Sequence, residues 1–111
     1  MKEIVNKNET RFIIGQNASE NEYLTLKYKR EEGLALWFHV DGFAGGHIIV
    51  IGEDISEDEI QEAVSYAIAQ SKAPDGTYVS YCHIKDVKKK RGDPIGMFQI
   101  NNFKRVKGYR K

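Results

Sequence analysis

The chain has 111 residues, of which 41% are hydrophobic and 30% charged, and this composition is typical of a globular protein with one domain, here residues 1–111. No apolar run approaches the roughly 20 residues of a membrane span, and residues 1–7 lack the apolar core of a signal peptide. We therefore expect a cytoplasmic protein with no membrane partner. The single cysteine, Cys82, excludes an internal disulfide and fits a reducing compartment.

The formal net charge of +1 hides a division of charge along the chain. Residues 85–111 hold ten Lys or Arg and two Asp, a net of +8, whereas residues 1–84 hold seven basic and fourteen acidic residues, a net of −7. A basic end on an acidic body is typical of proteins that bind polyanions. The same pattern also fits a solvated tail, or a module whose basic end docks on an acidic protein partner.

In chain order, the pattern begins with a strand and a helix. Residues 11–14, an Arg followed by three apolar residues, predict a strand that ends at Gly15. Ser19 and Glu22 have the spacing of a capping box, so we expect a helix over residues 20–30.

An antiparallel hairpin is expected next. Residues 34–40 and 47–51 have strand composition, and the connection over residues 41–46 is too short for a parallel crossover. The glycines of this connection fit a tight turn. They also fit a loop that a phosphate backbone can approach closely, with Gly45 and Gly46 as the candidate residues.

The second helix has the clearest pattern in the chain. Ser56 and Glu59 form a capping box, and apolar residues then recur at helical spacing over residues 60–68. This stripe predicts a helix that packs one face on the core.

The remaining segments predict strands. Residues 77–84 have strand propensity throughout, and residues 96–100 and 103–106 predict a final hairpin around Asn101 and Asn102. The predicted order is therefore β-α-β-β-α-β-β-β. It defines an α+β fold in which two main helices pack on a mostly antiparallel sheet.

Aromatic and imidazole side chains gather around the predicted hairpin. Trp37 and His39 share one face of a strand and Phe38 takes the other. Either Phe38 is buried and the other two form a surface on which bases stack, or the reverse arrangement holds. His39 and His47 fall near the same end of the hairpin, and we expect them to act in one functional patch rather than in the core. In the alternative, both imidazoles bond internally and hold the hairpin to residues 17–22.

We expect no metal, no cofactor and no enzymatic activity. The candidate metal ligands are His39, His47, Cys82 and His83. None of the usual ligand spacings occurs, and Cys82 and His83 point to opposite faces of a strand. Cys82 could act as a nucleophile with a histidine as base, but a buried structural cysteine is the simpler interpretation.

Several motifs in this order resemble the NFACT-R domain, the RNA-binding-type domain of the NFACT proteins of ribosome-associated quality control. They are Gly15-x-Asn17-x-x-x-Asn21-Glu22-x-Leu24, Trp37-Phe38-His39, Gly45-Gly46-His47, the Ala-rich helix that ends at Ser71, the segment from Val79 to Lys89, and Gly92-Asp93-Pro94-Ile95-Gly96. The resemblance covers residues 10–107 and implies a free-standing copy of the domain. The sequence departs from the family pattern in four places. Gln16 stands where the family usually has a basic residue and Ala35 where it has Asp, while Ala44-Gly45 replaces a Pro-Gly and Tyr81-Cys82 a Tyr-Thr.

The resemblance implies an RNA-binding protein that recognises tRNA or ribosome-associated RNA, with the ribosome or RNA-processing proteins as further partners. The candidate RNA-binding residues are Asn17, Asn21, Glu22, Trp37, His39, Gly45, Gly46, His47, Lys88, Lys89, Lys90 and Arg91. The first three would organise the junction between strand and helix or contact sugar and base edges. The aromatic and imidazole rings would stack on bases, and the basic run would hold phosphates. An enzyme or accessory factor in tRNA modification is the alternative.

Overall fold

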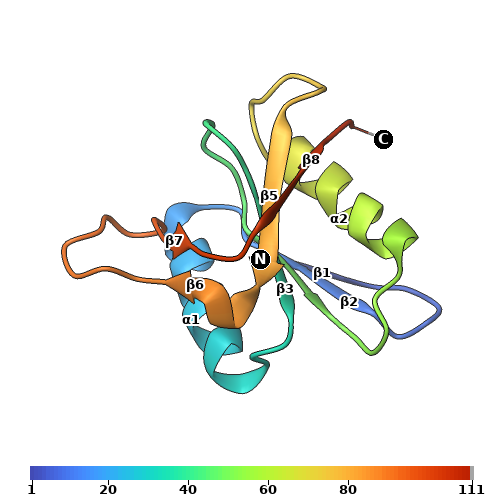
Figure 1. Ribbon diagram of the computed structural model, residues 1–111, viewed down its shortest axis with the longest axis horizontal. Coiled ribbons are helices and arrows are strands. Elements are labelled where there is room, and N and C mark those ends of the chain that lie inside the picture. The colour runs from blue at the N-terminus through green and yellow to red at the C-terminus, as the bar shows by residue number, and fades with distance from the viewer. Residues whose placement is uncertain (111) are drawn as a thin grey trace.

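The computed structural model describes residues 1–110 and places a six-stranded sheet between two helices (Figure 1). The helices are α1 (Ala18–Glu31) and α2 (Glu57–Ala69), with a short 3-10 helix, η1 (Ile84–Asp86). The strands are β1 (Lys2–Val5), β2 (Arg11–Ile14), β3 (Leu36–Val40), β4 (Ile48–Ile51), β5 (Tyr78–His83), β6 (Val87–Lys88), β7 (Gln99–Ile100) and β8 (Lys104–Lys107).

The strand pairing confirms the predicted α+β class and the predicted alternation of helices and strands. The large sheet has the order β1-β2-β4-β3-β5-β8, and β6 pairs with β7 in a separate two-stranded sheet. Every strand pair is antiparallel. Strands β1 and β6 were not predicted, because β1 is largely polar and exposed and β6 has only two residues.

Each face of the large sheet carries its own hydrophobic core. Helix α2 covers one face, where Phe38 packs with Val64 and Ile68. Helix α1 covers the other face, where Trp37 packs with Leu24. The expectation that only one of Phe38 and Trp37 is buried is therefore wrong, since the sheet is covered on both sides and both rings lie inside.

The two helices begin differently. Helix α2 starts with the predicted capping box, in which the Glu59 amide donates to Ser56 Oγ at 3.1 Å and the Ser56 amide donates to Glu59 Oε1 at 3.0 Å. Helix α1 does not use the predicted Ser19–Glu22 box. Its N-cap is Asn17, whose side chain accepts from the Glu20 amide at 2.9 Å. An Asn at this position caps the helix as well as Ser does, so α1 begins at Ala18 and Glu22 is free to bind elsewhere.

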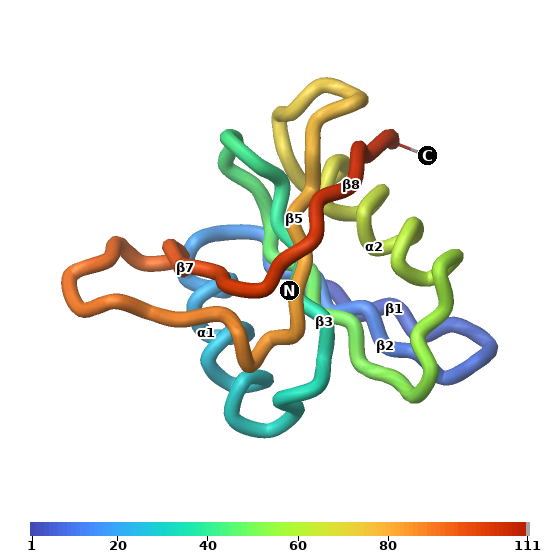
Figure 2. The backbone as a smooth tube through the Cα atoms, viewed as in Figure 1, coloured from blue at the N-terminus to red at the C-terminus, as the bar shows by residue number. Residues whose placement is uncertain are grey.

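The predicted C-terminal hairpin is wrong in its pairing. Strand β7 pairs back onto β6, and β8 instead joins the edge of the large sheet beside β5. Figure 2 shows the long hairpin of residues 87–100 leaving the body beside α1, and the chain then crossing back to β8. Strand β8 pairs with the main sheet because Val106 then packs against the core under α2. A separate two-stranded hairpin would leave Val106 without such packing.

Candidate nucleic-acid interface

Trp37 and His47 belong to a buried polar network on the α1 side of the sheet. Thr25 Oγ1 lies 2.9 Å from His47 Nδ1, and Trp37 Nε1 lies 3.2 Å from Thr25 Oγ1 and 3.3 Å from His47 Nδ1. Both rings are only 3% exposed. The expectation that Trp37 and His47 stack on bases is therefore wrong, because a ring enclosed by α1 and the sheet has no face to offer.

The network keeps His47 neutral. An indole N–H can only donate, so Nδ1 of His47 accepts from Trp37 and carries no hydrogen. Burial, together with the neighbouring His39, lowers the pKa of His47 to about 3. His47 thus bonds internally, as in the structural alternative considered from the sequence.

His39 lies beside this network but is only partly buried. Its ring centroid is 5.2 Å from that of His47 and 6.0 Å from that of Trp37, so the expected proximity of the two histidines is confirmed. His39 lines a surface cavity of about 300 Å³ together with the loop that contains Gly96 and Phe98. Burial lowers its pKa as well. His47 lines the same cavity but is only 3% exposed, so His39 is the predicted ring with the most surface to offer a ligand.

Asn21 and the glycines join α1 to the β3–β4 loop. The Asn21 amide donates to the Gly45 carbonyl at 3.1 Å and accepts from the His47 amide at 3.0 Å. A Cβ atom on Gly46 would lie 1.9 Å from the Gly15 carbonyl oxygen, and the Gly46 amide already donates to Gln70. The close approach at Gly46 is therefore made by protein backbone. Gly45 and Gly46 nevertheless line an open cleft, so a phosphate contact at this loop stays a prediction.

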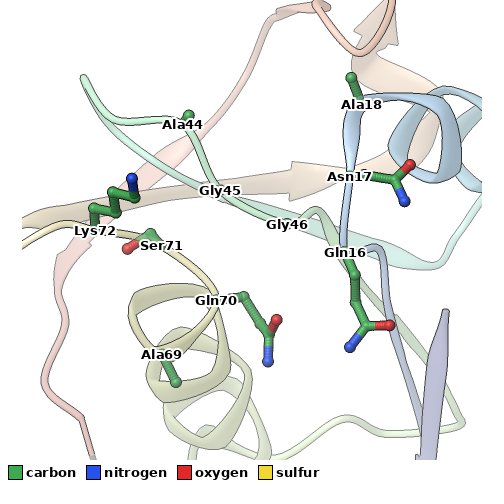
Figure 3. Close-up of a pocket in the computed structure, with 10 residues that line it drawn as sticks. All are labelled: Gln16, Asn17, Ala18, Ala44, Gly45, Gly46, Ala69, Gln70, Ser71 and Lys72. Atoms are coloured by element: carbon green, nitrogen blue, oxygen red, sulfur yellow. The ribbon is translucent and has the colours of Figure 1, made fainter.

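A cleft of about 490 Å³ opens at the surface of this junction. Figure 3 shows Gln16 and Gln70 on opposite walls, with Gly45 and Gly46 on the chain segment that runs past them and Lys72 at the far end. Within residues 1–110, the Gln70 side-chain amide makes no hydrogen bond, and the Asn17 amide nitrogen also lacks a partner. The cleft can therefore offer amide donors, amide acceptors and one cation to a polar ligand.

The structure separates the four predicted basic residues of the β6–β7 hairpin. The ammonium of Lys89 bonds Glu22 Oε1 at 2.8 Å and the carbonyls of Pro94 at 2.6 Å and Met97 at 3.0 Å. All three of its hydrogens are used, so the expectation that Lys89 holds phosphate is wrong. Glu22 also accepts from the Gly96 amide at 2.8 Å. The hydrogen bond from Lys89 and, to a smaller extent, the one from this amide lower the pKa of Glu22. Glu22 thus ties the hairpin to α1.

The other three basic residues of the run are exposed. Within the described chain, Lys88, Lys90 and Arg91 form no ion pair with a carboxylate. Lys104 and Lys107 on β8 are likewise exposed and without an ion pair in residues 1–110. Lys111, the last residue of the predicted basic segment, lies outside the described residues. The hairpin and β8 therefore present cations that can meet phosphates.

Sequence patterns did not reveal the contribution of β8. Arg105 Nε donates to Asp41 Oδ2 at 2.8 Å, and its guanidinium lies 4.5 Å from the ring centroid of Tyr78. The available signal was the spacing of Arg105 and Lys107, which places both on one face of a strand. Their aromatic neighbour, Tyr78, could not be found without the pairing of β5 with β8.

No feature of the described residues provides a metal centre or an activated thiol. Within residues 1–110, no three His, Cys, Asp or Glu side chains gather closely enough to hold a metal ion. Burial, together with the nearby Asp86, raises the pKa of Cys82 to about 12. His83 faces away from Cys82 and is exposed. No helix within residues 1–110 has the length and apolar character needed to cross a membrane.

The fold and the basic surface define an α+β module that presents cations on a hairpin and an edge strand. The chain belongs to the NFACT protein RNA binding domain family, whose model matches residues 2–102. This match confirms the resemblance found in the sequence motifs.

Known relatives share the domain but are much longer. The chain is 33% identical over 86 residues to the Rqc2 homolog RqcH of Bacillus subtilis (strain 168), which covers 76% of this chain and 15% of that protein. It is 28% identical over 92 residues to RqcH of Streptococcus pneumoniae, covering 79% of this chain and 16% of the relative. The chain thus spans about one sixth of the length of these relatives.

A solved structure shares the fold. The C-terminal part of the fibronectin/fibrinogen-binding protein from Streptococcus suis superimposes with a TM-score of 0.88 at 23% identity. The superposition covers 98% of this chain and 44% of that one. At this identity, the likeness supports the arrangement of helices and strands.

Proposed function

We propose that this protein binds structured RNA, either tRNA or ribosome-associated RNA, and acts in translation quality control in the cytoplasm. The family to which the chain belongs supports RNA as the ligand. The similarity to RqcH, which is described as a homolog of Rqc2, supports a role near the ribosome. Binding rather than catalysis is proposed, since the buried Cys82 thiol has a raised pKa, the reverse of what a nucleophile needs.

The observation that carries the proposal is the set of exposed cations on the β6–β7 hairpin. Lys88, Lys90 and Arg91 extend from a hairpin that Lys89 and Glu22 anchor to α1. Because Lys89 is neutralised by Glu22, the neighbouring cations are presented on a fixed support rather than on a loose tail. Cations held in this way can contact successive phosphates without a large loss of conformational entropy.

The identity of the RNA is tested by sequencing RNA crosslinked to the protein in cells. We expect tRNA or ribosomal RNA to be enriched over its cellular abundance. The variant in which Lys88, Lys90 and Arg91 are all replaced by Gln should recover much less RNA. Recovery of RNA in proportion to abundance, equally by both proteins, would contradict the proposal.

A matched control variant separates the hairpin from general electrostatics. Lys2, Lys7 and Arg30 are also two lysines and one arginine, are exposed, and form no ion pair within residues 1–110. Replacing these three by Gln changes the net charge by the same amount. We expect this control to recover nearly as much RNA as the unchanged protein.

A further inference from the structure

An exposed aromatic ring lies against cations at the edge of the large sheet. Tyr78, the first residue of β5, is 40% exposed. The Arg105 guanidinium lies 4.5 Å from its ring centroid, and the Lys107 ammonium lies 5.8 Å from it. The register of β5 and β8 produces this contact, because Tyr78 pairs directly with Lys107 and Ser80 with Arg105.

The surrounding residues hold Arg105 in place. Its Nε donates to Asp41 Oδ2 at 2.8 Å, and Asp41 Oδ1 accepts from the buried Ser80 hydroxyl at 2.6 Å. The Asp41 amide in turn donates to the Tyr78 carbonyl at 2.9 Å. Strands β5 and β8 and the turn that follows β3 therefore fix the guanidinium beside the ring. An Arg that is already ordered loses little entropy when a ligand covers it.

We propose that Tyr78 and Arg105 form a stacking platform for one unpaired nucleobase of a bound RNA. Aromatic rings and guanidinium planes are the surfaces on which proteins stack splayed bases. Asp41 neutralises Arg105, so Lys107 is left as the net cation beside the platform and contacts the adjoining phosphate. Lys107 makes no ion pair within residues 1–110 and can move aside from the ring as the base arrives.

The platform predicts a preference for unpaired RNA, which the cations of the hairpin do not. A base within a duplex has both faces covered by its neighbours, so it cannot stack on Tyr78. Phosphates, in contrast, are exposed in single strands and duplexes alike. This inference rests on the proposed RNA binding and adds to it the form of RNA that the β5–β8 edge recognises.

The test compares one oligoribonucleotide as a single strand and annealed to its complement. The strand carries a fluorescent base analogue whose emission is quenched by stacking. We expect the protein to bind the single strand more tightly and to quench the probe. Tyr78→Ala should weaken single-strand binding roughly 5- to 150-fold, the range measured for loss of one stacked base, and remove the quenching. Its affinity for the duplex should be unchanged.

Two further variants keep the test independent of folding. Tyr78→Phe retains the ring and should bind as the unchanged protein does. Arg105→Lys retains the charge but loses the guanidinium plane, so it should lose part of the single-strand preference. The inference is overturned if Tyr78→Ala retains the preference, or loses duplex and single-strand affinity equally. If the variant of Lys88, Lys90 and Arg91 loses affinity while Tyr78→Ala does not, the proposal of RNA binding is supported and only the stacking platform is refuted. If the unchanged protein binds neither RNA, both fail.

Discussion

Acidification should destabilise this protein well above the pH at which its carboxylates titrate, because His47 is buried in its neutral form. The pKa of His47 is about 3 in the folded protein, against an ordinary value of 6.5. Between these two pH values, His47 binds a proton in the unfolded chain but stays neutral in the folded chain. The free energy of unfolding therefore falls as the pH is lowered from about 6.5 towards 3.

The size of the effect follows from the two pKa values. At pH 5.0, which lies about 1.5 units below the pKa of His47 in the unfolded chain, proton binding to the unfolded chain lowers the free energy of unfolding by about 2 kcal/mol. His39 acts in the same direction, because burial lowers its pKa too. Hydrogen bonds from Ser56, Thr10 and Asn6 lower the pKa of the Glu59 carboxylate to about 2. Glu59 therefore adds to the loss of stability mainly below pH 4.5. Its stabilisation is present at neutral pH and is lost as the pH falls towards 2.

Urea unfolding at pH 7.5 and pH 5.0 measures the effect. We expect the unchanged protein to lose about 2 kcal/mol or slightly more between the two values. The matched variant is His47→Asn, whose side-chain oxygen can accept from Trp37 where Nδ1 did, but which does not titrate. This variant should lose much less stability over the same interval. An equal loss in both proteins would refute the assignment of the pH dependence to His47.

Three further substitutions, one of them with a matched control, test the packing that positions the surface. Asn21→Ala should lower the free energy of unfolding by about 1–3 kcal/mol in a urea titration, since it leaves the buried His47 amide and the partly buried Gly45 carbonyl unpaired. Gly46→Ala should destabilise by more than about 3 kcal/mol because its Cβ meets backbone. Gly33→Ala is the control, because its Cβ would lie at an ordinary contact distance of 4.0 Å from the Lys29 carbonyl oxygen, and it should change stability by less than about 0.5 kcal/mol. Lys89→Met should lower the melting temperature, since it removes the hydrogen bonds that Lys89 donates to Glu22 and to two carbonyls. Equal melting temperatures of the variant and the unchanged protein would contradict the anchoring role.

The sequence predicts local structure well where pattern and cap agree. Helix α2 has both an apolar stripe and a capping box. Ala63, Val64, Ala67 and Ile68 of the stripe are buried, and Ile60 is partly buried. The β3–β4 hairpin follows from a connection too short for any other arrangement. The fate of β8 could not be predicted, because its partner β5 lies more than twenty residues earlier and adjacent pairing with β7 is the shorter-range alternative.

The candidate site is predicted only in outline. The proximity of His39 and His47 follows from the hairpin, but the burial of His47 depends on α1, which no local pattern places over that face. Within the basic run, Lys88 and Lys89 look alike in sequence. Only the position of Glu22 on α1 distinguishes the anchored lysine from the exposed one. Two residues of the same type therefore differ in role because of contacts with residues that are distant in sequence.

The most direct test of the central claim is the salt dependence of RNA affinity. A filter-binding titration with tRNA over a series of salt concentrations gives the slope of log affinity against log salt. Replacing Lys88, Lys90 and Arg91 by Gln should weaken binding and flatten that slope by roughly 0.7–0.9 for each phosphate that the variant no longer neutralises. The matched variant of Lys2, Lys7 and Arg30 should leave the slope nearly unchanged. A hairpin variant whose slope and affinity equal those of the unchanged protein would contradict RNA binding through the hairpin.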